Sequence, residues 1–115
     1  MRGAILFARL GSNIVGTVAL KREDAVTFEL TKMAVDERWQ GRGLGRCLLE
    51  SACRLARARG AARVLLYSHR SLEPAIKLYH AQGFVEQPLG TSRYLRSNIK
   101  MLFELPTPVS PKVFA

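Results

Sequence analysis

Short apolar runs alternate with polar turns over the first third of the chain. Residues 4–10 and 14–20 are apolar, and residues 11–13, Gly-Ser-Asn, favour a turn between them, so this segment predicts a β-hairpin. Residues 21–24 are all charged and predict a second turn. Residues 25–35 are then read as a further strand, so the pattern predicts an antiparallel meander of three strands.

The middle of the chain changes to helical periodicity. A helix is predicted from Leu44, because apolar positions recur along one face while charged residues occupy another. Gly60 is placed to end this helix, just beyond its last turn. The apolar positions that carry the period are Leu48, Ala52, Leu55 and Ala56.

A second helix is predicted after a buried strand at residues 63–68. Ser71 is expected to cap its N-terminus, since a hydroxyl can accept a hydrogen bond from the first turn. Pro74 fits the first turn, where its missing N–H costs nothing. Gly83 ends the helix.

The remaining residues complete a sheet. Phe84 begins another strand, residues 88–92 form a loop, residues 99–105 form the last strand, and residues 106–115 are a Pro-rich tail. The order β-β-β-α-β-α-β-β predicts a single domain over residues 1–105 of the α/β (α+β) class. We expect a mixed, mostly antiparallel central sheet flanked by two helices.

Length and composition also indicate one domain. A chain of 115 residues, 48% of them hydrophobic, can bury about two-thirds of the surface that its unfolded form exposes. No apolar run approaches the roughly 20 residues that span a bilayer, and the N-terminal apolar run is too short for a signal sequence. We therefore expect a cytoplasmic protein with no membrane association.

Cys47 and Cys53 would point about 120° apart on one helix and fit no metal spacing, so we expect reduced thiols and no metal.

The most specific motif is Gln-Gly-Arg-Gly-Leu-Gly at residues 40–45, between the third strand and the first helix. Glycines let backbone N–H groups approach an anion closely, and a helix start adds free donors and a positive dipole end. A Walker A loop would continue as Gly-Lys-Ser/Thr, which is absent. A dinucleotide fingerprint would place glycine at Arg46 and an acidic residue near Leu65, so it is also disfavoured.

The remaining pattern, Gln-x-x-Gly-x-Gly, resembles the pyrophosphate loop of the GNAT superfamily of acyl-CoA-dependent N-acyltransferases. The resemblance extends through residues 29–35 before the loop and through residues 74–79 and 83–84 after it, and it covers roughly residues 4–105. It implies a GNAT-like fold and transfer of an acetyl group from acetyl-CoA to a primary amine, directly in a ternary complex.

The resemblance also implies where acetyl-CoA, the co-substrate, would bind. In the family, backbone amides of the loop bind the pyrophosphate, and the preceding strand splays from its parallel neighbour so that the pantetheine arm pairs with its backbone. The Met33 N–H is then a candidate for polarising the thioester carbonyl. Leu72 replaces an asparagine common in the family, and Ser71 is the candidate to substitute for it. The expected coenzyme-binding residues are Met33, Ala34, Val35, Gln40, Gly41, Arg42, Gly43, Leu44, Gly45, Arg46, Ser71, Ala75 and Leu78.

Glu29 matches the position of a catalytic glutamate in several family members. The match implies a general base that acts directly or through water, and apolar neighbours would raise its pKa. Strand alternation places Glu29 on the same side as Thr31, Met33 and Val35 unless a bulge intervenes. The alternative is a surface glutamate paired with Lys32 or an arginine.

Tyr79 matches the tyrosine that, in many family members, donates a proton to the departing thiolate. A phenol with a pKa near 10 suits that role. Its helical spacing from Ala75 and Leu78 is equally consistent with core packing. His69 and His80 are not expected to be catalytic.

The chain starts where the second strand of the family fold would begin, which the resemblance leaves open to three interpretations: the chain is a fragment, another subunit supplies the missing wall of the acceptor site, or this version of the fold is a reduced one. A second hypothesis is therefore a non-catalytic CoA-binding sensor or accessory subunit.

The net charge of +9 attracts anions, but the basic residues are scattered, so we expect no nucleic-acid partner. The acceptor is expected to be a small-molecule or peptide amine. An uncovered first strand makes a homodimer plausible.

Overall fold

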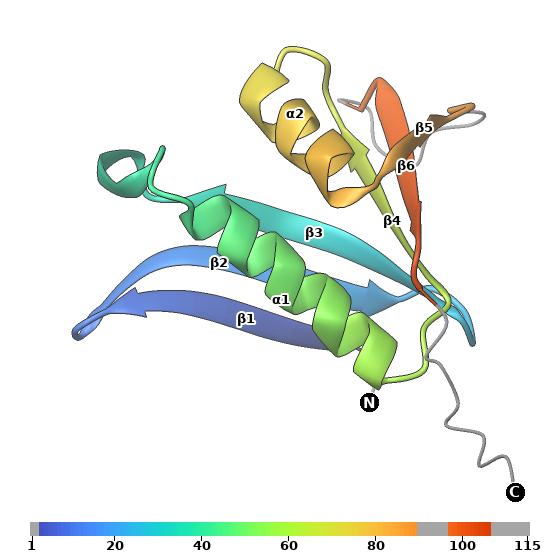
Figure 1. Cartoon of the computed structure of the whole chain (residues 1–115), viewed down its shortest axis with the longest axis horizontal. Helices are drawn as coiled ribbons and strands as arrows, with labels where there is room; N and C mark the ends of the chain where they lie inside the picture. Colours follow the sequence, from blue (N-terminus) through green and yellow to red (C-terminus); the bar gives the residue numbers. More distant parts are fainter. Residues whose placement is uncertain (1–2, 90–96, 107–115) are drawn as a thin grey trace, which may run out of the picture.

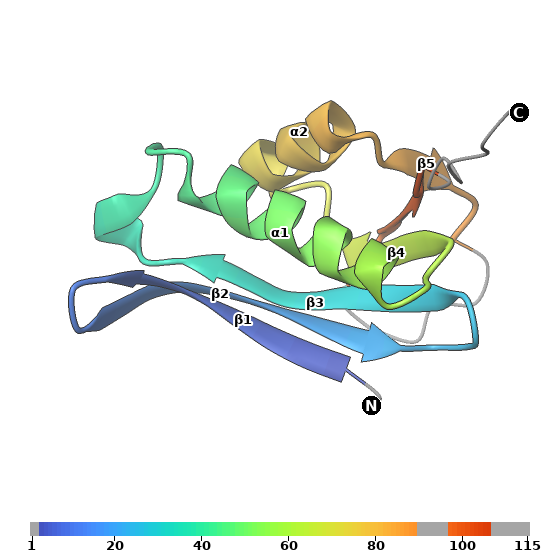
Figure 2. The ribbon, with the colours of Figure 1, turned by 60° about the horizontal axis from the view of Figure 1, so that its bottom comes forward.

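The computed structural model describes residues 3–89 and 97–106 and contains a sheet with two α-helices packed on one face (Figures 1 and 2). The elements are β1 (Gly3–Leu10), β2 (Asn13–Arg22), β3 (Thr27–Val35), the 3-10 helix η1 (Glu37–Trp39), α1 (Leu44–Ala58), β4 (Arg63–Ser68), α2 (Glu73–Gln82), β5 (Val85–Gln87) and β6 (Ile99–Glu104). The predicted fold class is confirmed. Residues 90–92 of the predicted loop and residues 107–115 of the predicted tail lie outside the described residues.

The sheet has the strand order β1-β2-β3-β4-β6-β5. All neighbouring pairs are antiparallel except β3 and β4, which are parallel and are joined through α1. The parallel pair therefore lies at the centre of the sheet, and the long connection that it requires supplies the first helix.

The core lies between the sheet and the helices. Alternate residues of the central strands point toward the helices, and α1 meets them with a face that includes two alanines of zero exposure. These small side chains let the helix approach the sheet closely. The main contributors are Val18, Leu20, Phe28, Leu30, Leu49, Ala52, Ala56, Val64 and Leu66.

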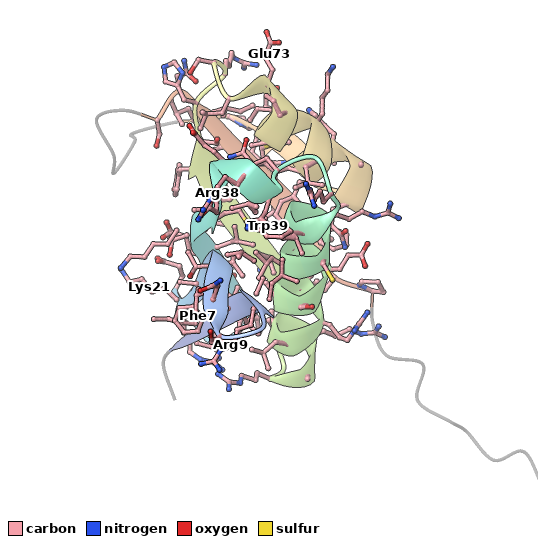
Figure 3. All side chains as sticks on the ribbon, turned by 90° about the vertical axis from the view of Figure 1, so that its left-hand side faces the viewer. Phe7, Arg9, Lys21, Arg38, Trp39 and Glu73 are labelled. Carbon is pink, nitrogen blue, oxygen red and sulfur yellow. The ribbon has the colours of Figure 1, made fainter. Side chains whose placement is uncertain are left out.

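The opposite face of the N-terminal half of the sheet is more open. Ile5 and Phe7 of β1 and Ile14 of β2 are 59%, 54% and 52% exposed. Figure 3 labels Phe7 there, with Arg9 two residues further along the same strand. The strand β1 is an edge of the sheet, as expected. The homodimer stays a prediction.

A bulge in β3 changes which way its side chains point. Thr17 of β2 pairs with Ala34, but Ala19, two residues on, pairs with Thr31, so β3 holds one extra residue there. Lys32 in this segment has a φ of +53°, the left-handed conformation that non-glycine residues rarely adopt. The prediction that Glu29 and Met33 share one side of the strand is therefore wrong. The extra residue turns Met33 toward α1.

Both α-helices end at glycines, as predicted, but one predicted start is wrong. Gly60 has a φ of +88° and lies one residue beyond the cap of α1. Gly83 has a φ of +119° at the end of α2. The N-cap of α2 is Leu72, which offers no side-chain acceptor, and not Ser71. The Ser71 hydroxyl lies 2.7 Å from Nδ1 of His69 instead, because that imidazole is only two residues away.

Candidate active site

The turn before α1 presents a row of open backbone donors. Gly41 and Gly43 have φ values of +76° and +84°, and Gly43 caps α1 without any side-chain hydrogen bond. The first helical bond runs from the Cys47 N–H to the Gly43 carbonyl, 3.0 Å away. Among the described residues, none accepts a hydrogen bond from a backbone N–H of residues 41–46. We call these six residues the amide cradle.

The amide cradle is held in place from its N-terminal side. The Asp36 N–H donates to the Val15 carbonyl at 2.8 Å, which ties the end of β3 to β2. The Gln40 side chain donates from Nε2 to the Val35 carbonyl at 3.0 Å. Gln40 is a predicted coenzyme-binding residue, and in the free protein part of its amide group shapes this turn.

Three arginines lie in the amide cradle or just before it: Arg42 and Arg46 belong to it, and Arg38 precedes it. Arg38 pairs with Asp36 at 3.2 Å, and this contact holds the pKa of the Asp36 carboxyl below its usual range. Arg46 pairs with Glu50 at 3.1 Å, one helical turn away. The Arg42 guanidinium instead lies over the ring of Trp39, 4.8 Å from its centroid.

Sequence reasoning did not single out Trp39. It belongs to η1, a short helix that was not predicted either. In Figure 3, Arg38 and Trp39 project from η1 to different sides, with Trp39 on the side of α1. An aromatic residue three positions before an arginine, in a segment that forms a helical turn, was the available signal.

The two parallel strands diverge beside the amide cradle. Their ladder consists of the pairs Thr27 with Arg63, Phe28 with Val64 and Glu29 with Leu65. Within the described residues it ends there, although β3 runs on to residue 35 and β4 to residue 68. Figure 1 shows the two strands separating toward the end of β3 that leads to the turn. The expected divergence is therefore present, and it begins at Glu29.

Four of the predicted coenzyme-binding residues meet at the start of α1. A Cβ atom on Gly45 would lie 3.4 Å from Leu78 Cδ2, 3.6 Å from Met33 Cε and 3.8 Å from Val35 Cγ2. The fold thus joins β3, the first turn of α1 and α2 at one point. Ala75 lies one turn before Leu78 on α2 and is half-buried, whereas Ala34 is exposed.

Tyr79 is nearly buried in α2. It is 6% exposed and packs edge-on against Phe84, with ring centroids 5.9 Å apart. Burial raises the pKa of the Tyr79 hydroxyl. The hydroxyl therefore keeps its proton at neutral pH, and the ring also belongs to the core.

Glu29 is buried in the middle of the sheet. It is 1% exposed, so the alternative of a surface glutamate is wrong. Phe28 and Leu30, its neighbours along β3, belong to the core beneath the helices, and strand alternation points Glu29 to the other face. Glu29 also belongs to the last pair before β3 and β4 diverge.

The other polar groups near α2 form a local cluster. Besides Ser71, the ring of His69 lies near Asn98, with 3.3 Å between Nε2 and Nδ2. The Asn98 side chain also accepts from the Arg70 N–H at 2.8 Å. This cluster joins the end of β4 to the start of β6.

Cys47 is exposed and Cys53 is buried, and neither is in a disulfide. Burial raises the pKa of Cys53 to about 12. Within the described parts of the chain, no group of three or more His, Cys, Asp or Glu side chains could hold a metal ion. No helix there is long and apolar enough to cross a bilayer.

Comparison with known proteins identifies the family. The model of the acetyltransferase (GNAT) domain matches residues 2–86. The mycothiol acetyltransferase of Beutenbergia cavernae is 42% identical over 71 residues, which are 62% of this chain and 24% of that protein. The human N-acetylaspartate synthetase is 35% identical over 78 residues, 67% of this chain and 26% of that protein.

The fold is also that of solved GNAT structures. A GNAT family acetyltransferase from Elizabethkingia anophelis, solved with acetyl-CoA bound, superposes with a TM-score of 0.80 at 22% identity. The match covers 90% of this chain and 77% of that one. The chain spans about a quarter of the length of the curated relatives that it matches.

Proposed function

The chain belongs to the GNAT acetyltransferase family, and we propose that it transfers the acetyl group of acetyl-CoA directly to a primary amine. The observation that carries this proposal is the amide cradle, whose six N–H groups have no acceptor among the described residues. Residues 40–43 and 46 are exposed, so these donors are accessible to a ligand, and a helix N-terminus favours negative charge. A diphosphate supplies both the acceptors and the charge.

The rest of the coenzyme would follow the diverging strands. Beyond Glu29 the β3 backbone has no ladder partner from β4 among the described residues, so its polar groups can pair with the pantetheine amides. Met33, Val35 and Leu78 around Gly45 would line this path with apolar atoms. The Met33 N–H is our candidate for polarising the thioester carbonyl.

Two buried side chains would carry out the proton transfers of the reaction. Glu29 is the proposed base, which removes a proton from the acceptor ammonium so that the amine nitrogen can attack the thioester carbon. Tyr79 is the proposed acid, which protonates the departing sulfur as the carbon–sulfur bond breaks. A raised pKa keeps its proton in place until then.

The test combines coenzyme binding with turnover. Acetyl-CoA at 100 times its Kd should stabilise the fold by about 2.7 kcal/mol, which a thermal melt detects. A panel of primary amines, including amino acids, is then assayed for release of the CoA thiol. Binding with turnover that is lost in Glu29→Gln supports the proposal. Binding without turnover of any amine would instead favour a CoA-binding sensor, and no binding refutes both.

A further inference from the structure

Arg38, Arg42 and Arg46, which lie in the amide cradle or just before it, are not equally available to a ligand. Arg38 and Arg46 each hold a carboxylate, from Asp36 and Glu50. A phosphate group would have to compete with those carboxylates for the same N–H donors. Among the residues that the structure describes, no carboxylate pairs with Arg42.

Arg42 is held by an aromatic ring instead. Its guanidinium carbon lies 4.8 Å from the centroid of the Trp39 ring. A cation over a ring uses the face of the guanidinium, whereas its N–H donors lie in the guanidinium plane. The stack therefore orders the arginine and leaves its donors free for a planar fork of hydrogen bonds.

The backbone fixes both partners relative to the amide cradle. Arg42 lies between Gly41 and Gly43, both left-handed, so its own amide belongs to the cradle. The Trp39 N–H donates to the Asp36 carbonyl at 2.8 Å, and Asp36 is in turn bonded to β2. The ring is thus carried by a short helix that is anchored to the sheet.

We propose that Trp39 is a positioning residue that holds the Arg42 guanidinium ready to bind a phosphate group of the coenzyme. The proposal rests on the proposed function, because it assumes that coenzyme A binds at the amide cradle. Ordering the side chain in the free protein lowers the entropy cost of binding. Trp39 acts through Arg42, so its effect should vanish when Arg42 is replaced.

Trp39 is the one tryptophan of the chain, so its fluorescence reports on this stack directly. Excitation at a wavelength that avoids adenine absorption gives a single signal. Titration with CoA should change the emission of the wild type, because the stacked arginine gains a phosphate partner. The Arg42→Gln variant should differ in emission before any CoA is added.

Affinities for CoA then test the coupling. Arg42→Gln should weaken binding about tenfold, the usual loss for one charge-assisted contact. Trp39→Leu should weaken it about 2- to 5-fold, and Trp39→Phe should restore most of that loss. The double variant should bind no more weakly than Arg42→Gln alone. Arg38→Gln, which removes the same charge four residues earlier in the same connection between β3 and α1, is the matched control and should stay within twofold.

Several results would overturn the proposal. The first is that the double variant loses as much CoA affinity as the two single variants together. The second is that Trp39→Leu binds CoA as tightly as the wild type, and the third is that Arg38→Gln loses as much CoA affinity as Arg42→Gln. If Trp39→Leu does not fold, the proposal is tested by comparing the emission and the CoA affinity of the wild type, Trp39→Phe and Arg42→Gln. Dephospho-CoA identifies the phosphate, since the Arg42→Gln loss persists with it only if the diphosphate is bound. A wild type that does not bind CoA refutes the proposed function itself.

Discussion

The two helices of this protein begin in different ways, although neither has a side-chain cap. At α1 the cap is a left-handed glycine, the first turn holds no acidic residue, and the donors of the amide cradle are open. At α2 the cap is Leu72, and the first turn holds Glu73 and Pro74. Proline removes one donor, and glutamate supplies the negative charge that the helix dipole favours.

The comparison shows that an anion site needs more than a helix N-terminus. The Glu73 carboxylate offsets the positive dipole end at the start of α2, so this helix start attracts a phosphate less strongly. At the start of α1 no acidic residue offsets the positive dipole end, and a glycine turn precedes it. The α2 helix instead contributes side chains from its later turns, Leu78 at Gly45 and Tyr79 in the core.

The largest effect is expected from disrupting the start of α1 itself. Gly43→Val should abolish stabilisation by acetyl-CoA in a thermal melt. A β-branched residue is strained at a φ of +84°, and its side chain would stand among the donors of the cradle.

Gly60→Val is the matched control at the other end of the same helix. Gly60 has a similar φ of +88°, and in both positions nothing lies within 4 Å of an added Cβ. The two variants should lose comparable stability in the absence of ligand. Acetyl-CoA should still stabilise Gly60→Val, and a failure to do so would contradict the assignment of the cradle.

The next effect concerns the contribution of α2 to chemistry. Tyr79→Phe should lower the rate of acetyl transfer by at least about 100-fold, a usual loss for a general acid. Coenzyme affinity should change little, because the ring that packs against Phe84 is retained. Steady-state kinetics and a binding isotherm measure the two quantities. Tyr67→Phe, on β4, is the control, and a similar rate loss there would contradict a special role for Tyr79.

Most of this architecture was predictable because its signals are local. The apolar periods, Gly60, Gly83 and the glycine turn of residues 40–45 each act within a few residues of themselves. The parallel pairing of β3 and β4 followed from the family resemblance. The observed strand ends differ from the predicted ones by at most two residues, which is the usual scatter of such boundaries.

The features that were missed have neither an apolar period nor a glycine to mark them in the sequence. The bulge at Lys32 is set by pairing with β2, since no glycine marks the left-handed residue. That one extra residue decides the side on which Met33 lies. Ser71 fails as a cap because His69 takes its hydroxyl. The stack of Arg42 on Trp39 required a short helix that the sequence pattern does not indicate.

A smaller effect is expected when the start of α1 is made to resemble that of α2. Arg46→Glu places an acidic residue in the first turn, as Glu73 is in α2. Coenzyme affinity should fall about 5- to 10-fold at low salt and less at high salt, because ions screen an exposed charge. The free energy of unfolding should change by less than about 1 kcal/mol, since the favourable dipole term is offset by repulsion from Glu50.

Glu73→Lys applies the opposite charge change to α2. Because we assign no phosphate to that helix start, the CoA affinity of this variant should stay close to that of the wild type. An affinity gain as large as the loss in Arg46→Glu would show that the overall charge, and not its position, controls binding.

The smallest effect separates the open start of α1 from its buried interior. At pH 8 a thiol reagent should modify exposed Cys47 quickly and leave Cys53 intact until the protein unfolds, because burial raises the Cys53 pKa to about 12. The unfolded thiol loses its proton near pH 8.5, so the folded state binds more protons above that value. Stability present below pH 8.5 is therefore lost as the pH rises toward 12, by about 1.4 kcal/mol at pH 9.5. Chemical denaturation of Cys53→Ala should lack this loss, whereas Cys47→Ala should retain it. Equal pH slopes for the two variants would mean that the third turn of α1, which holds Cys53, is as open as the first.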